Sequence, residues 1–302
     1  MSHSDFCARL LVAIAVCFHL QCKQITNPRH ASYREAKYYL SVCAVFRNET
    51  KYLKEWIEYH RLVGVDHFYL YNNNSLDRPA GILKSYIDKG IVTLIHWPDR
   101  LGQQRDTFMW SLGVQISAYE NAIYWAALKE TTWLAILDID EFLVPSTENN
   151  LVEMLEKYKQ YPGVVLSKAY YDASSADVSP SGSLIIESIG MIENPFREFL
   201  PKSVEKMIFR PKMCESFTWT PYRCVFKKNQ QPIVLTKLEM RVNHYSNRSK
   251  KVLEGERNKR VLHIDQRFCG EQQVSELLHA GYAIEDAEKA VYRFVPEVLR
   301  RM

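Results

Sequence analysis

Hydrophobic and polar positions along this chain fall into runs that predict strands and helices in alternation. Residues 39–46 are mostly apolar or β-branched, which indicates a buried strand. The next apolar positions recur at the spacing of one helical face, and Gly64 follows them as a helix end. These positions are Leu53, Trp56, Ile57, His60 and Val63. The pattern therefore predicts a strand followed by an amphipathic helix.

The same alternation continues to residue 166. We expect further strands at residues 67–71, 91–97, 133–137 and 164–166, and helices at residues 80–89, 111–129 and 151–161. This order predicts an α/β fold, in which one Rossmann-type domain has a mostly parallel central sheet flanked by helices. Ligands of such sheets bind beyond the carboxyl ends of the strands. After residue 170 prolines interrupt the pattern, so we expect a looser half and then a helical extension over residues 271–302 that packs on the domain.

Composition narrows the class of protein. The 302 residues are 47% hydrophobic and 25% charged, which is typical of a globular protein and excludes a disordered, collagen-like or polytopic membrane chain. The 39 Lys and Arg against 35 Asp and Glu leave a net charge of +4, spread along the chain, so nucleic acid is not expected as a partner. No CxxC pair occurs among the seven cysteines, which argues against a zinc ribbon. Cys214 and Cys224 either form a disulfide in an oxidising compartment or remain buried thiols.

An apolar run at residues 10–20 suggests a targeting segment. A spanning helix needs about 20 apolar residues, so this run is short for a full span but fits the core of a signal peptide. We predict a signal peptide or short membrane anchor over residues 1–22 and a polar stalk over residues 23–37. The alternative is a helix packed on the domain. The protein is thus expected to be membrane-associated through its N-terminus or exported, and cytoplasmic if this segment is not a signal.

The sharpest local feature is WLAILDIDEFLVP at residues 133–145. An apolar strand there would deliver Asp138 and Asp140 to one face, because strand side chains alternate, and Glu141 would follow at the turn. Two neighbouring carboxylates repel each other unless a cation lies between them. Their oxygens suit Mg²⁺ or Mn²⁺, which can carry the charge of a departing diphosphate. The alternative is a strand end with solvated acids.

Polar side chains also follow the first two predicted strands. They are Arg47, Asn48 and Glu49 after the first and Asn72, Asn74 and Asp77 after the second. Their amides and carboxylates could hydrogen-bond a base and a ribose. Asn and Asp are also the ordinary residues of turns, so both interpretations stay open.

N-x-S/T sequons, which are acceptor sites for N-linked glycans, conflict with a ligand-binding cleft at these strand ends. They begin at Asn48, Asn73 and Asn247, and the first two fall at the strand ends where a ligand would bind. A glycan there would block binding. Either these two asparagines are not glycosylated or the cleft lies elsewhere.

Seven stretches of the chain resemble glycosyltransferase family 92, in the family's order and over roughly residues 39–250. They are residues 41–53, 55–64, 67–77, 115–119, 133–145, 206–211 (KMIFRP) and 243–245 (NHY). The resemblance implies the GT-A fold, with a glycosyltransferase domain over residues 38–270. Residues 38–166 would form its nucleotide-sugar half and residues 167–270 its acceptor half.

The resemblance also implies a metal-dependent reaction that transfers a hexose from a UDP-linked sugar with inversion at the anomeric carbon. The acceptor would be a hydroxyl group of a glycan or of a lipid- or protein-linked molecule. Asp138 and Asp140 would match the D-x-D site for the metal and the diphosphate, and His244 would complete the sphere of Mn²⁺ or Mg²⁺. Lys206 and Arg210 could contact phosphate or acceptor oxygens.

The general base and two alternative functions stay open. Asp172 and Glu198 are candidate bases for the acceptor hydroxyl, and nothing in the sequence chooses between them. One alternative function is a haloacid-dehalogenase-type phosphatase, whose D-x-D also ends an apolar strand. The other is a non-catalytic module that binds glycans or a partner, because the acceptor half departs from the family at residues 172–176, 216–219 and 247–251.

Overall fold

The computed structural model of this chain describes residues 36–98, 107–148, 150–172, 184–187, 192–193, 206–217, 223–236, 238–246, 291 and 293–302. The predicted signal or anchor segment, most of the stalk, Asn247 and Glu198 lie outside the described residues. So does most of the predicted C-terminal extension. None of the described helices is long and apolar enough to span a membrane.

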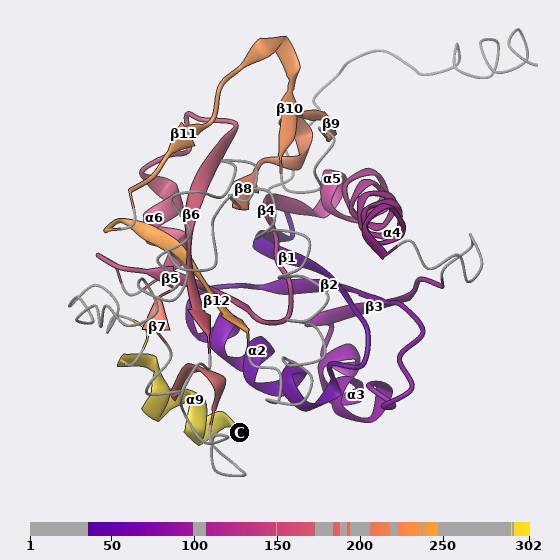
Figure 1. Cartoon of the computed structure of the whole chain (residues 1–302). Helices are drawn as coiled ribbons and strands as arrows, with labels where there is room; N and C mark the ends of the chain where they lie inside the picture. Colours follow the sequence, from indigo (N-terminus) through magenta and orange to yellow (C-terminus); the bar gives the residue numbers. More distant parts are fainter. Residues whose placement is uncertain are drawn as a thin grey trace, which may run out of the picture. The chain divides into compact units, whose positions relative to one another are not determined.

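The first half of the sheet is parallel, as predicted (Figure 1). Its strands lie in the order β3-β2-β1-β4. They are β1 (Tyr38–Phe46), β2 (His67–Asn72), β3 (Val92–His96) and β4 (Thr131–Ile136). Because β1 pairs in parallel with both β2 and β4, the carboxyl ends of these strands meet at one edge. The predicted α/β class with a mostly parallel sheet is confirmed.

The second half of the sheet is better ordered than the predicted loops. Among the described residues β8 (Lys206–Phe209) lies antiparallel between β4 and β6 (Gly163–Asp172). Next, β12 (Met240–Ser246) pairs in parallel with β6, and β5 (Glu141–Pro145) pairs antiparallel with β12. The short strands β7 (Ile192–Glu193) and β11 (Ile233–Val234) also pair with β6. The predicted strand at residues 164–166 is therefore the start of a ten-residue strand.

Around the first half of the sheet, α2 (Thr50–Leu62) and α3 (Ala80–Asp88) lie on one face and α4 (Thr107–Asn121) lies on the other (Figure 1). A π-helical segment, Ala122–Ala127, joins α4 to α5 (Leu128–Glu130). The other described α-helices are α6 (Leu151–Glu156) and α9 (Val295–Arg301). Alternate residues of β2 face opposite sides: Phe68 packs with Trp56 of α2, and Tyr69 lies in the cluster that contains Tyr119 of α4. Burial of each large side chain contributes about 1.5–3 kcal/mol.

The turn between α2 and β2 depends on Gly64. Its φ of +107° lies where side chains are strained, and a Cβ there would lie 2.6 Å from Asn150 Oδ1. That oxygen already accepts a hydrogen bond from the Val152 N–H at the start of α6, at 2.7 Å. Gly64 therefore lets two segments of the chain meet at close range.

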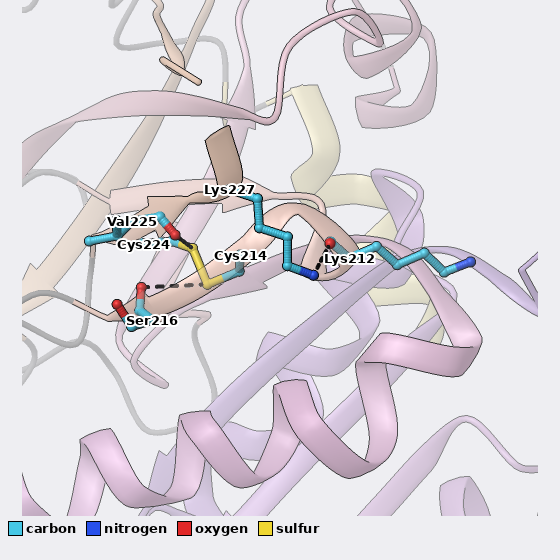
Figure 2. The surroundings of a disulfide bond; sticks show 6 residues. All are labelled: Lys212, Cys214, Ser216, Cys224, Val225 and Lys227. Carbon is cyan, nitrogen blue, oxygen red and sulfur yellow. Dashed lines mark hydrogen bonds between the residues drawn. A yellow bond between two sulfur atoms is a disulfide. The ribbon is translucent and has the colours of Figure 1, made fainter. Parts of the chain in front are cut away.

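A hairpin outside the main sheet is closed by a disulfide (Figure 2). It consists of β9 (Cys214–Phe217) and β10 (Cys224–Phe226), and the bond joins Cys214 to Cys224. The Lys227 ammonium donates to the carbonyl of Lys212 at 2.9 Å, beside this bond. Of the two readings that the sequence left open, the structure has the disulfide.

We predict that Gly64→Ala lowers the free energy of unfolding by about 1–3 kcal/mol, because it adds backbone strain and a clash with Asn150. Urea unfolding measures the change. The matched control is Gly81→Ala, where nothing lies within 4 Å of the new Cβ. In the helix α3 this change should be neutral or stabilise by up to about 1 kcal/mol. Equal effects of the two variants would contradict the argument.

We also predict that reduction of the Cys214–Cys224 bond lowers stability by about 2–4 kcal/mol, because the open chain gains conformational freedom. Thermal unfolding with and without a reductant measures the loss. The control is the double variant Cys214→Ser, Cys224→Ser, which should unfold at the lower temperature and not respond to the reductant. A wild-type protein that ignores the reductant would contradict the prediction.

Candidate functional site

The acidic triplet lies in a turn between two strands. β4 ends at Ile136 and β5 begins at Glu141, so the prediction that a strand places Asp138 and Asp140 on one face is wrong. The predicted turn after the triplet is instead the strand β5. The Glu141 N–H donates to the Asp138 carbonyl at 3.1 Å, and Glu141 Oε2 accepts from the Asp138 N–H at 2.9 Å. Glu141 therefore closes the turn with both its backbone and its side chain.

The Glu141 carboxylate is fully buried between two lysines. Lys168 Nζ of β6 lies 2.5 Å from Oε1, and Lys206 Nζ of β8 lies 2.7 Å from Oε2. Burial by itself raises the pKa of Glu141, but the two ammonium groups outweigh it and hold the pKa at about 2. This carboxylate is therefore ionised throughout the physiological range.

Lys206 also reaches the first aspartate of the triplet. Its Nζ donates to Asp138 Oδ2 at 3.1 Å. The lysine side chain is 1% exposed, whereas that of Asp138 is 28% exposed. Asp138 thus has one oxygen turned inward to an ammonium and a side chain that still reaches solvent.

His244 lies against the second aspartate. Its Nε2 is 3.1 Å from Asp140 Oδ2, although 104 residues separate the two. β12 brings them together, because His244 pairs with Glu141 in register and the Tyr245 N–H donates to the Asp140 carbonyl at 2.8 Å. Burial by itself lowers the pKa of the imidazole, but the carboxylates of Asp140 and Glu141 together raise it more, so the net shift of the pKa is upward.

The structure thus gathers four of the predicted site residues around one turn: Asp138, Asp140, Lys206 and His244. Across the part of the chain that the structure describes, no three His, Cys, Asp or Glu side chains already form a cluster that could hold a metal ion. Asp138 pairs with Lys206, while Asp140 pairs with His244. The donors of a cation site lie around the same turn, but they contact protein partners.

The polar residues after β1 and β2 hold two loops together. Asn48 Oδ1 accepts from the Leu76 N–H at 2.8 Å, and Asp77 Oδ2 accepts from the Thr50 N–H at 2.8 Å. Likewise Asn72 Oδ1 accepts from the Ser75 N–H at 2.9 Å. These bonds fit the turn interpretation and leave the nucleotide-binding interpretation untested.

Three further predicted residues accompany these loops. Asn48 and Asn74 adopt left-handed φ angles of 58° and 54°, which Asn tolerates better than most residues. Arg47 is exposed and Glu49 is half-buried beside them. All lie at the edge of the sheet where the turn of Asp138 and Asp140 follows β4.

Asn73 settles part of the glycosylation conflict. Its side chain is buried, and its Nδ2, the atom that would carry a glycan, donates to the Trp97 carbonyl at 2.8 Å. A glycan on Asn73 is therefore incompatible with this fold. Asn48 is exposed.

Two candidates, Arg210 and Asp172, lie at opposite edges of the sheet, because β8 runs antiparallel to β6. Arg210 follows the far end of β8, where it donates to the Lys159 carbonyl at 3.0 Å and lies 5.9 Å from the Trp133 ring. The structure does not bring it to the turn of Asp138. Asp172 is the last residue of β6 and pairs in register with Ser246, two residues after His244.

Sequence reasoning missed Lys168 and the structural role of Glu141. A lysine within the apolar run of β6 was the available signal, because a buried ammonium needs a buried carboxylate. A cavity of about 760 Å³ also went unpredicted; it lies between α4 and β9 and is lined in part by Trp97, Tyr124 and Phe217. None of the predicted site residues lines it.

Comparisons with known proteins give the family. The sequence model of glycosyltransferase family 92 matches residues 36–276. A family 92 protein from Ricinus communis is 26% identical over 197 residues, which are 64% of this chain and 32% of that protein. One from Oryza sativa subsp. japonica is 24% identical over 221 residues, 72% of this chain and 35% of that protein. The chain therefore spans about a third of the length of these curated relatives.

Similarities to solved structures are more distant. The mannosyltransferase PcManGT from Pyrobaculum calidifontis, in complex with GDP-Man and Mn²⁺, has a TM-score of 0.43 and 13% identity over 99% of this chain and 81% of that one. For S. aureus TarS 1–349 in complex with UDP the TM-score is 0.38, with 12% identity over 80% of this chain and 69% of that one. The match of the family model over most of the sequence is the decisive finding: this chain belongs to glycosyltransferase family 92.

Proposed function

We propose that this chain is a metal-dependent glycosyltransferase that transfers a hexose from a UDP-linked sugar to a hydroxyl acceptor. The observation that carries the proposal is the grouping of Asp138 and Asp140, on the turn after β4, with His244 of β12 at the carboxyl edge of a parallel sheet, in a chain of this family. That edge is where sheets of this kind bind their ligands.

The chemistry of the turn suits a divalent cation. Two carboxylates and an imidazole are ligands that Mn²⁺ accepts, and Mg²⁺ takes the carboxylates readily. Their side chains are 28%, 35% and 25% exposed, so all three can be reached from solvent. Asp138, Asp140 and His244 would hold the ion. When bound, it would offset the negative charge that develops on the diphosphate leaving group.

Residues of the chain itself would do the remaining work. Glu141 keeps the turn closed, and Lys206 places an ammonium beside Asp138. A carboxylate would accept the proton of the acceptor hydroxyl as it attacks the anomeric carbon in an inverting transfer. Asp172, at the carboxyl end of β6, and Glu198 are the candidates for that base. The acceptor would be a glycan, or a lipid- or protein-linked hydroxyl.

The disulfide supports a membrane-associated or exported protein. Bonds such as Cys214–Cys224 persist in oxidising compartments. The apolar run at residues 10–20 would serve as the signal or the anchor. A cytoplasmic location would keep both cysteines reduced.

Family membership separates the proposed enzyme from one of the two alternative functions, the phosphatase, but not from the other, the non-catalytic binding module. Membership of family 92 argues against a phosphatase of the haloacid-dehalogenase type. A non-catalytic binding module would share the family and the turn, so only an assay of sugar transfer separates it from the enzyme. Transfer to any acceptor excludes that module.

We predict that the double variant Asp138→Ala, Asp140→Ala loses Mn²⁺-dependent binding of uridine diphosphate by about a hundredfold or more, equivalent to about 2.7 kcal/mol. Calorimetric titration of the nucleotide with and without Mn²⁺ measures this. The control is Asp88→Ala on α3, an exposed aspartate paired with Lys84, which should bind as the wild type does. Unchanged metal-dependent affinity in the double variant would refute the assignment.

We further predict that the base can be identified from the rate alone. Either Asp172→Asn or Glu198→Gln should lower kcat for sugar transfer by about 10²–10⁴-fold, because the acceptor proton then has no positioned acceptor. Affinity for the donor should stay within about threefold, equivalent to about 0.7 kcal/mol. If neither variant lowers kcat, the base is a different residue.

A further inference from the structure

Five charged side chains meet at the turn between β4 and β5. Asp138, Asp140 and Glu141 bring three negative charges, and Lys168 and Lys206 bring two positive ones. His244 stands at the edge of this group, against Asp140. Without the histidine, the group has a single net negative charge.

Lys206 is the lysine in direct contact with a candidate cation ligand. Its Nζ lies 3.1 Å from Asp138 Oδ2 and 2.7 Å from Glu141 Oε2, and its side chain is 1% exposed. Lys168 binds the other oxygen of Glu141 and is 5% exposed. Because both carboxylate contacts of Lys206 lie within the fold, its charge is fixed in place beside Asp138.

A fixed positive charge beside a ligand opposes cation binding. An ammonium and a divalent cation a few ångströms apart repel enough to weaken binding by about tenfold even at the dielectric constant of water. A site with one net negative charge therefore attracts a divalent ion weakly. A nucleoside diphosphate changes this balance, because its phosphate oxygens add negative charge next to the same ligands.

We propose that Lys206 is a positioning residue whose fixed charge lowers the affinity of the Asp138 site for a divalent cation, with and without a bound nucleoside diphosphate. This inference rests on the proposed function, since it takes Asp138 as a cation ligand. The factor by which the nucleotide tightens cation binding arises from the attraction between the phosphate oxygens and the cation, so it should be the same with and without Lys206.

The experiment is a titration of Mn²⁺ into the full chain, with free Mn²⁺ followed by electron paramagnetic resonance, in the presence and absence of uridine diphosphate. In the wild type we expect weak binding alone and tighter binding with the nucleotide. In Lys206→Met the Mn²⁺ affinity should rise by about tenfold without nucleotide and by about the same factor with it. No sugar transfer is needed for this readout.

Matched variants separate charge from shape. Lys206→Arg keeps the charge and should stay within about threefold of the wild type. The double variant Glu141→Gln, Lys206→Met removes one charge of each sign, so its affinity should also return to within about threefold. Lys84→Met, an exposed lysine on α3, should change nothing.

Unchanged or weaker Mn²⁺ binding by Lys206→Met would overturn the inference. Should that variant fail to fold, Lys168→Met makes the same charge change on the other side of Glu141. It should raise the affinity in the same direction, and a fall or no change would overturn the inference equally. A wild type that binds no Mn²⁺ even with uridine or guanosine diphosphate would instead refute the proposed function.

Discussion

The ion pairs of Glu141 are the interaction on which the site depends. A carboxylate with no exposed surface is stable only if its charge is compensated. Lys168 and Lys206 form ion pairs with Glu141, and the Asp138 N–H donates a hydrogen bond to it. Those partners belong to β6, β8 and the turn after β4, so one side chain ties the acidic triplet to the second half of the sheet. Loss of one partner of such a buried pair generally costs about 3–5 kcal/mol, because the other charge is left uncompensated.

The parallel half could be predicted because its signals are local. Phe68 and Tyr69 are neighbours on one short apolar strand, and each packs into a different hydrophobic cluster, one on each face of the sheet. The helix α2 follows from the spacing of Trp56 and Ile57, and the glycine at its end is required by a positive φ. For elements of this kind the pattern within about a dozen residues decides the structure.

The second half could not be predicted in this way, because its strands pair across long stretches of sequence. The sequence pattern predicts a turn at Glu141, because the partner that makes residues 141–145 a strand is β12, about a hundred residues later in the chain. The strand predicted at residues 133–137 ends at Ile136, and Asp138 and Asp140 lie in the turn that follows it, so the alternation of a strand does not set their directions. Lys206 and Arg210 belong to one sequence motif, but they lie at opposite ends of β8, so that Lys206 contacts Asp138 and Arg210 contacts Lys159. The motif alone does not show that the strand separates them.

The position of β5 at the end of the sheet has a consequence for synthesis of the protein. In the described part of the chain its strand partner is β12, which is made almost a hundred residues later. At ordinary translation rates this delay lasts about 5–20 seconds. During that time the edge of β5 that later pairs with β12, at Phe142, Leu143 and Val144, has no neighbouring strand, and such an edge can bind chaperones or aggregate when it is left exposed.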